Sequence, residues 1–272
     1  MMRKIIYLVF LCTSLFACQD VVELDLKTAE PRLVIDASLT WFKDTTGKNQ
    51  FIKLSLTSSF YSKTTPPATG ATVSVTDQNN NTFNFIEEDE TGIYRNQSFI
   101  PEINGVYNLK IIYKNEVYTA TETMQPVVNI DRIEQKNDSG FNKDETEIKA
   151  FYTDPKNIEN YYLFEFINAN SSVLSLDVYS DKFNDGNQIF AFYSNEDVKP
   201  GDELIIQGHG VSKRFYQYMF ILLQQSSDDS GGPFQTQPAT VRGNCVNQTN
   251  PSNYPYGYFR ASEVAVFKYI VK

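Results

Sequence analysis

The chain has 272 residues, with 24 basic and 33 acidic side chains and a formal net charge of −9. Nucleic-acid binding requires clustered lysine and arginine to neutralise phosphates, so this acidic balance argues against a nucleic-acid partner. Apolar residues make up 41 % of the sequence, which is typical of a globular protein and argues against disorder. The length is enough for one large domain or two ordinary ones.

The N-terminus has the features of a secretory signal. Arg3 and Lys4 precede a short apolar run from Ile5 to Phe16, and this run is too short to span a bilayer, which needs about 20 residues. The run ends in Leu-Phe-Ala-Cys at residues 15–18, which resembles a bacterial lipobox, in which the cysteine thiol is acylated (with palmitate, for example) and becomes the mature N-terminus. A cleaved signal peptide followed by a chance cysteine is the alternative.

We therefore expect a signal peptide over residues 1–17, lipidation at Cys18, and a lipid tether over residues 18–30. Loss of Arg3 and Lys4 leaves 22 basic against 33 acidic residues and a net charge of −11. This charge argues against electrostatic docking on anionic lipid. Membrane attachment then depends mainly on the acyl chains, and a triacylated cysteine supplies more than the single chain that binds only marginally.

The first half of the mature chain reads as a series of short strands. The 17 Tyr and 20 Phe against one Trp, with frequent Thr, Val and Ile, favour strands over helices. Alternating apolar residues and turn signals predict strands at residues 32–41, 51–57, 71–76, 82–86, 92–95, 105–113 and 116–121. Their regular spacing predicts an immunoglobulin-like β-sandwich over residues 31–126. No cysteine pair or core tryptophan of the antibody type supports a true immunoglobulin domain.

The second half, residues 127–272, is expected to form another β domain. Strands are predicted at residues 127–133, 147–152, 161–167, 174–179, 188–193, 203–207 and 264–270. The polar residues 134–145 are expected to form a long hairpin loop, and Gly208-His209-Gly210 to end the strand series. The fold class predicted is therefore all-β with one helix: an immunoglobulin-like sandwich followed by a second β-sandwich or barrel-like domain.

The one helix is predicted over residues 212–225. Ser212 can cap its N-terminus, and Phe215, Met219 and Leu222 fall at the spacing of one helical face. Tyr218 and Leu223 widen this face, which should lie against a sheet.

Few residues are suited to catalysis. Cys245 is the only mature cysteine besides Cys18, so no intrachain disulfide is expected. Cysteine–histidine chemistry would need Cys245 beside His209, the only histidine. We expect Cys245 to pack and His209 to be structural or exposed. Because the chain has no Gly-x-Ser-x-Gly elbow, phosphate loop or dinucleotide fingerprint, we expect no enzyme and no cofactor.

Two acidic segments contain candidate metal ligands. Residues 181–187, Asp-Lys-Phe-Asn-Asp-Gly-Asn, only partly match a calcium loop, because Phe183 occupies a ligand position and no glutamate follows at the required distance. A hairpin turn is expected there instead, since Asp-Gly is a strong turn signal. Asp228 and Asp229 are expected to be a solvated pair. We therefore expect no metal site.

The aromatic loop from Asn253 to Phe259 is the best candidate for an exposed contact surface. Tyr254, Tyr256 and Tyr258 can stack on sugar rings or on peptide side chains, and tyrosine is favoured at interfaces. The alternative is that Tyr256, Tyr258 and Phe259 pack the last corner of the sandwich.

An ordered set of short motifs resembles a known family. The motifs are Leu33-Val34-Ile35, Gly70-Ala71-Thr72-Val73, Tyr107-Asn108-Leu109, Asp154-Pro155, Tyr161-Tyr162, Pro200-Gly201-Asp202, Gly231-Gly232-Pro233-Phe234, Gly243-Asn244 and Gly257-Tyr258-Phe259-Arg260-Ala261-Ser262. With the lipobox ahead of them, they resemble the domain-of-unknown-function 4249 family of Bacteroidota outer-membrane lipoproteins over nearly the whole mature chain. The resemblance implies a lipoprotein on the cell surface or the periplasmic face of the outer membrane, often encoded beside a TonB-dependent transporter. It implies no known activity and no catalytic residues.

These observations lead to one main functional hypothesis and two alternatives. The main hypothesis is a non-enzymatic, lipid-anchored accessory or binding protein that works with a TonB-dependent transporter in nutrient uptake. One alternative is a surface adhesin or structural module, although the chain shows no internal repeat. The other is a hydrolase with a non-local site around His209 or the acidic loops.

Overall fold

The computed structural model describes residues 29–59, 62, 64–139, 145–170, 174–226 and 241–272. The predicted signal peptide, Cys18, most of the tether, and Asp228 and Asp229 lie outside these residues. The segment Pro31–Lys272 forms one compact unit. None of the helices within the described ranges has the length and apolar character needed to cross a membrane.

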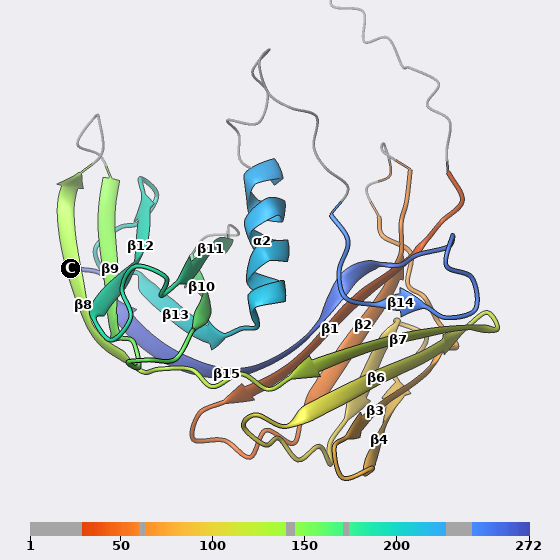
Figure 1. Ribbon diagram of the computed structural model, residues 1–272. Coiled ribbons are helices and arrows are strands. Elements are labelled where there is room, and N and C mark those ends of the chain that lie inside the picture. Colours follow the sequence, from red (N-terminus) through yellow and green to blue (C-terminus); the bar gives the residue numbers. More distant parts are fainter. Residues whose placement is uncertain (1–28, 60–61, 63, 140–144, 171–173, 227–240) are drawn as a thin grey trace, which may run out of the picture. The chain divides into compact units, whose positions relative to one another are not determined.

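The described chain consists of strands and one helix (Figure 1). This confirms the predicted all-β fold class. The strands of the first half are β1 (Leu33–Phe42), β2 (Gln50–Leu56), β3 (Thr72–Asp77), β4 (Thr82–Glu87), β5 (Ile93–Asn96), β6 (Val106–Tyr113) and β7 (Glu116–Thr123). Those of the second half are β8 (Ile130–Ser139), β9 (Glu145–Thr153), β10 (Tyr161–Asn168), β11 (Leu174–Ser180), β12 (Gln188–Asn195), β13 (Glu203–Gly210), β14 (Val246–Asn247) and β15 (Tyr256–Ile270), with helix α2 (Lys213–Ser226) before β14.

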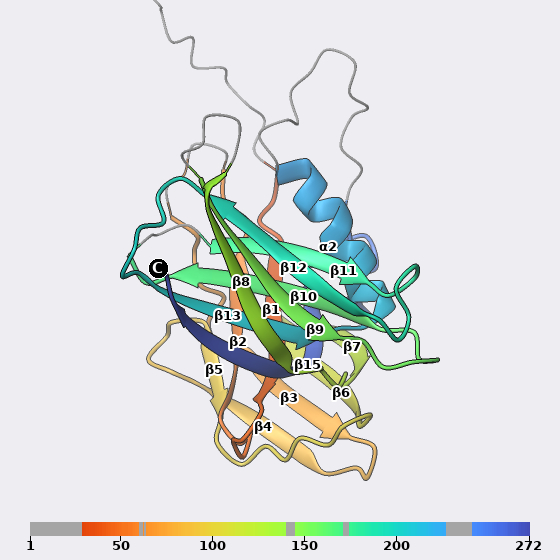
Figure 2. The same ribbon diagram turned by 90° about the vertical axis from the view of Figure 1, so that its left-hand side faces the viewer.

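The strands form two sheets. One has twelve strands in the order β11-β10-β13-β15-β1-β2-β5-β4-β3-β6-β7-β14, and the other has three in the order β12-β9-β8. Figure 2 shows the three-stranded sheet in front of β10 and β13. The long strand β15 joins the two halves, because it pairs antiparallel with β13 and parallel with β1.

The first hydrophobic core lies under β1 to β7. Alternate residues of β1 point into it, which is the period-two pattern that predicted this strand. The C-terminal part of the chain contributes Cys245, Phe259 and Ala261 to the same core. The expected boundary at residues 126 and 127 therefore separates two cores, but the chain after it returns to complete the first one.

The second core lies between the three-stranded sheet and β10 and β13. It is rich in aromatic rings, such as Tyr152, Phe164 and Phe166, and Ala265 of β15 also belongs to it. A third cluster lies between α2 and the opposite face of β10 and β15, where Leu163 and Tyr258 pack against Phe215 and Met219.

Helix α2 forms where the sequence predicts it. The Ser212 hydroxyl accepts a hydrogen bond from the backbone N–H of Phe215 at 3.3 Å, which is an N-cap contact. Phe215 and Met219 are buried as predicted, but Leu222 is exposed, and the neighbouring Leu223 packs against the third cluster in its place.

The glycines around His209 do not end β13, which continues to Gly210. They allow close packing instead. A Cβ at Gly208 would lie 3.1 Å from the ring of Phe164, and a Cβ at Gly210 would lie 2.0 Å from the carbonyl oxygen of Pro126. The prediction of a strand break was therefore wrong, because the glycines meet a steric demand and not a turn.

Two other local predictions were wrong. Residues 134–139 continue β8 although they are polar, since they pair with β9 across a register shift before Ser139. Residues 181–187 do not close a hairpin, because β11 pairs with β10 in the large sheet and β12 pairs with β9 in the small one. The segment crosses from the large sheet to the small one, because β11 and β12 pair with different partner strands.

Candidate functional site

The outer face of the three-stranded sheet carries exposed aromatic rings. In β9 and β12, inward residues such as Ala150 and Ala191 belong to the second core, whereas Phe151, Phe190 and Phe192 point the other way. Phe190 and Phe192 are 39 % and 41 % exposed. We call the outward side chains of β8, β9 and β12 the aromatic face.

Side chains on the aromatic face form rows across the strands. Arg132 of β8 pairs in register with Phe151 of β9, which in turn pairs with Phe190 of β12. The guanidinium carbon of Arg132 lies 3.6 Å from the centroid of the Phe151 ring, and the Phe151 and Phe190 centroids are 5.3 Å apart. Cation–π and ring–ring contacts therefore order this row. Lys149 adds a second cation, 5.0 Å from the Phe190 centroid.

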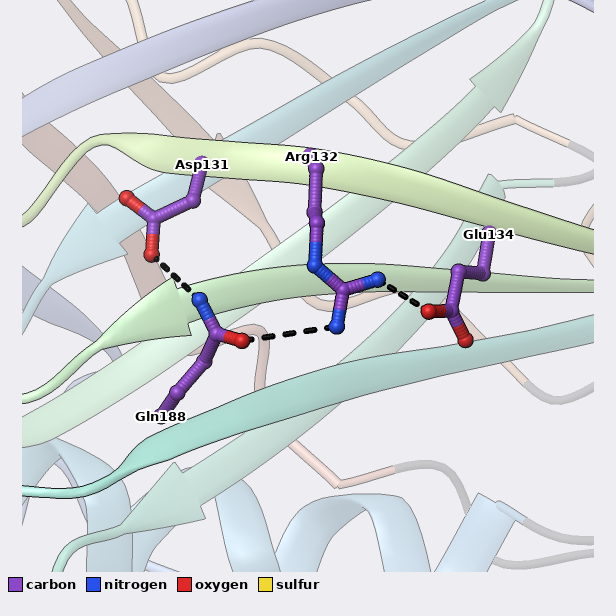
Figure 3. Close-up of polar contacts among 4 residues, drawn as sticks. All are labelled: Asp131, Arg132, Glu134 and Gln188. Carbon is purple, nitrogen blue, oxygen red and sulfur yellow. Dashed lines mark hydrogen bonds and ion pairs between the residues drawn. The ribbon is translucent and has the colours of Figure 1, made fainter.

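A polar network fixes the position of Arg132 (Figure 3). Its guanidinium pairs with Glu134 and donates to the side-chain oxygen of Gln188 at 3.4 Å. The Gln188 amide donates to Asp131 at 3.0 Å, and the Thr153 hydroxyl donates to the same carboxylate at 2.7 Å. The register shift between Ile130 and Arg132 lies beside this carboxylate. The result is a preorganised surface that combines flat rings with hydrogen-bonding groups.

The predicted tyrosine candidates separate into two environments. Tyr258 is only 6 % exposed; its ring contacts Phe215 edge-on at 5.0 Å, and its hydroxyl donates to half-buried Glu122 at 3.3 Å. For Tyr258 the packing alternative therefore describes the structure, because a buried ring offers no contact surface. Tyr254 and Tyr256 are half-buried and lie edge to face, with their centroids 5.6 Å apart.

Two arginines lie over Tyr254. The guanidinium carbons of Arg32 and Arg242 are 4.0 and 3.9 Å from the centroid of its ring. The Tyr256 hydroxyl, and then the charges of these two arginines, lower the pKa of Tyr254 below its usual value. This contact is not evident from the sequence, because Arg32 is more than 200 residues away from Arg242 and Tyr254 in the chain.

Three carboxylates meet beside the crossing between β11 and β12. Oxygen atoms of Asp154, Asp181 and Asp185 lie within 4.8 Å of one another, and a surface hollow of about 330 Å³ opens beside Asp181 and Asp185. The Tyr162 hydroxyl donates to Asp154 at 2.6 Å, and the Asn160 N–H donates to Asp181 at 2.7 Å. These are the residues in the described chain whose donor set suits a hard cation.

We expect Asp181→Asn to raise the free energy of unfolding at pH 7. Burial, and then the charges of Asp154 and Asp185, raise the pKa of Asp181 above its usual value. The stability that a protonated Asp181 contributes is therefore complete below the usual pKa, near about 3.9, and is lost as the pH rises through the raised pKa. Asparagine stays neutral and still accepts the hydrogen bond from Asn160.

Urea unfolding with a chelator present, at pH 7 and near pH 3.5, measures this effect. The gain should shrink at the lower pH, and the exposed control Asp89→Asn should show little change at either. A lower stability of Asp181→Asn at pH 7 would contradict the repulsion inferred here.

His209 and Cys245 are both buried, His209 beside charged residues and Cys245 in a hydrophobic core. The Nε2 atom of His209 lies 3.4 Å from Glu165, and burial, followed by the charge of Arg260, lowers the pKa of His209. Cys245 belongs to the first core, and burial raises its pKa to about 12, so the thiol stays protonated at neutral pH. The expectation that Cys245 packs is consistent with this environment.

Buried polar groups on β13 and β15 lack hydrogen-bond partners. Among the described residues, these include Nδ1 of His209, Nε and Nη1 of Arg260, and the hydroxyl of Ser262, while Nε2 of His209 has only its 3.4 Å contact with Glu165. His209 is 2 % exposed and Ser262 is fully buried. Because no hydrogen bond joins the serine to the histidine, this group does not form a nucleophile–base relay.

Across the residues that the structure describes, the fold and these surfaces define an all-β sandwich protein with one helix packed on its sheet, exposed aromatic rings, and arginines stacked on rings. A family model described as "Domain of unknown function (DUF4249)" matches residues 19–268, and the chain therefore belongs to this family. No curated protein matches the sequence.

Two solved structures from chicken are similar at low identity. A segment of two fibronectin type-III domains from tenascin is 9 % identical, with a TM-score of 0.22, over 66 % of this chain and 90 % of that one. The FN1–FN3 domains of CNTN1 are 13 % identical, with a TM-score of 0.23, over 66 % of this chain and 60 % of that one.

Proposed function

We propose that this protein is a non-enzymatic, lipid-anchored binding protein of the bacterial outer membrane, of the Bacteroidota type, facing the cell surface or the periplasm. In this proposal it serves as an accessory to a TonB-dependent transporter in nutrient uptake. The observation that carries the binding role is the aromatic face, where Phe190 and Phe192 are exposed beside an ordered arginine.

The chemistry of the aromatic face suits a protein partner. Phenylalanine and arginine are enriched in interface cores, and the face places Phe151, Phe190 and Arg132 in one row. The contacts to Glu134 and Gln188 already restrict the arginine, so little side-chain entropy is lost when a partner binds. Burial of His209 and of the Cys245 thiol supports a binding role over the hydrolase alternative.

Replacing both exposed phenylalanines tests the role of the aromatic face. We expect Phe190→Ser with Phe192→Ser to reduce the transporter that co-purifies from gently solubilised membranes at least tenfold, because interface anchors contribute about 2 kcal/mol or more each. Phe51→Ser is the matched control, since Phe51 is also exposed (52 %) and also lies near an arginine, with Arg95 5.6 Å from its centroid.

Thermal unfolding of all three proteins verifies that folding is intact. Equal recovery of the transporter with the double variant and with wild type would contradict the assignment of the aromatic face. A wild-type protein that is recovered alone would count against the transporter partnership itself.

The anchor is tested separately by Cys18→Ser, which removes the thiol that carries the acyl chains. We expect the variant to lose tight membrane association and to be extracted by salt and alkaline washes that leave the wild type in place. Without the acyl chains, the variant keeps only the apolar run from Ile5 to Phe16, which is shorter than a bilayer span. Unchanged resistance to these washes would contradict lipidation at Cys18.

A further inference from the structure

Two of the arginines in the described chain lie over one tyrosine ring where the compact unit begins, and a third contacts the residue next to one of them. Arg32 and Arg242 lie over the Tyr254 ring, at 4.0 and 3.9 Å from its centroid. Arg214 donates to the carbonyl oxygen of Gly243, the residue after Arg242, at 3.3 Å. In a chain of net charge −9, this is a local concentration of positive charge.

Neither Arg32 nor Arg242 is neutralised by a carboxylate of the described chain. The salt bridges found there involve other residues. The other exposed arginines that lie over aromatic rings are paired, Arg95 with Glu88 and Arg132 with Glu134. An arginine stacked on a ring therefore usually has a counter-charge in this protein, and this pair is the exception.

Glu116 is held in the same loop region but does not supply that counter-charge. It accepts hydrogen bonds from Tyr118, Asn247 and Asn253. The two guanidinium carbons lie within about 8 Å of each other, since each is about 4 Å from one centroid. This separation is about one Debye length at physiological ionic strength, so the two charges repel unless an anion lies near them.

We propose that Arg32 and Arg242 form a binding site for a phosphate group, with Tyr254 as the platform that keeps both guanidinium groups in place. Arginine suits this ligand because its planar donor fork matches phosphate oxygens bidentately. Arg32 uses Nη1 for the carbonyl oxygens of Ser252 and Tyr254, which leaves its other donors available. Arg242 makes a hydrogen bond with the Tyr254 side chain and donates none to a backbone or carboxylate group of the described residues, so the rest of its fork is available to a phosphate.

The position of Arg32 indicates where the phosphate comes from. It is the second residue of the compact unit, and it directly follows the segment that leads to Cys18. A chain anchored at Cys18 keeps this end of the domain near the membrane, so the phosphate of a lipid headgroup is the expected source. This choice of source depends on the proposed lipid anchor, whereas the phosphate chemistry does not.

The experiment uses the non-acylated mature chain, Gln19–Lys272, which retains the whole compact unit. Inorganic phosphate is titrated by NMR at low ionic strength, with chloride held constant. Sedimentation with phosphatidylglycerol vesicles, and with vesicles of neutral phosphatidylcholine, measures the lipid source. We expect Arg242→Gln and Arg32→Gln each to weaken phosphate binding about fivefold, since each basic residue contributes about 1 kcal/mol to such contacts.

Arg95→Gln is the matched control and should bind like wild type, because Arg95 also lies over a ring but is paired with Glu88. Arg242→Gln is the cleaner of the two test variants, since Arg32 also ties the loop through Ser252. If the wild type binds the anionic vesicles and both variants do not, the ligand is the phosphate of a lipid headgroup. If the wild type binds inorganic phosphate but not the vesicles, the ligand is a soluble phosphate. No binding to either probe, or equal binding by wild type and both variants, overturns the site.

Discussion

Replacing Gly257 by alanine is expected to lower the free energy of unfolding by at least about 3 kcal/mol. Gly257 has a φ of +88°, which L side chains rarely adopt, and a Cβ there would lie 2.0 Å from the carbonyl oxygen of Ile35. The same backbone is approached from its other side, because a Cβ at Gly243 would lie 1.7 Å from the Gly257 oxygen. Three chain segments therefore pack backbone to backbone at the parallel pairing of β1 and β15.

Gly201→Ala is the matched control for this prediction. Gly201 also has a positive φ, +97°, but nothing lies within 4 Å of the position its Cβ would take. Its cost should be limited to backbone strain, about 1–2 kcal/mol. Urea unfolding of the two variants measures the difference between their losses of unfolding free energy. This difference is the cost of the steric clash at Gly257, because both positions share the backbone strain. Equal costs would show that β1 and β15 can separate without loss of stability.

The second prediction concerns Arg260, which we expect to be replaceable by methionine with a gain in stability of about 1–4 kcal/mol. The residue is 9 % exposed, its Nε and Nη1 have no hydrogen-bond partner in the described structure, and its guanidinium carbon lies 5.3 Å from the Phe215 centroid. A buried cation with two nitrogens that make no hydrogen bond costs several kcal/mol, and the charges of Glu165 and Asp36 offset the burial of Arg260 only in part. Methionine avoids this cost and keeps the packing on Phe215.

The same variant should raise the pKa of His209, because the charge of Arg260 helps to hold that pKa down. His209 is the only histidine, so its NMR signal is assigned without ambiguity. Arg132→Met, at an exposed and paired arginine, should change stability by about 1 kcal/mol or less. A loss of more than about 1 kcal/mol in Arg260→Met would contradict this prediction and show that Glu165 and Asp36 compensate the buried charge.

The contacts of Arg260 also help to explain the role of the short motif Gly257-Tyr258-Phe259-Arg260. Gly257 packs against the β1 backbone and Phe259 enters the first core, whereas Tyr258 and Arg260 both contact Phe215 of helix α2. The charge of Arg260 also acts on the buried His209. The motif therefore lies at the place where the two halves of the chain share one strand, and most of its members have structural roles.

The candidate surfaces could be predicted from sequence only in part. The sequence indicates the aromatic loop as a candidate surface, but Tyr258 is buried, and the partners of Tyr254 come from residues 32 and 242. The aromatic face was missed, because Phe151 and Phe190 read as ordinary alternating strand residues until the register of β9 and β12 places them together. Asp154 also lies beside Asp181 and Asp185 only in the folded structure, because it follows β9, whereas the other two residues lie between β11 and β12.

By itself, the sequence determined the acidic charge, the signal and lipobox pattern, most strands of the described chain, and the capped helix at residues 213–226. These features are local, since period-two alternation, turn residues and a serine cap act over a few residues. Only the tertiary structure decided that β15 pairs parallel with β1, that β13 continues through its glycines, and that β11 and β12 lie in different sheets. These outcomes depend on pairing and close packing between segments more than a hundred residues apart or on opposite sides of a core, and no local pattern encodes them.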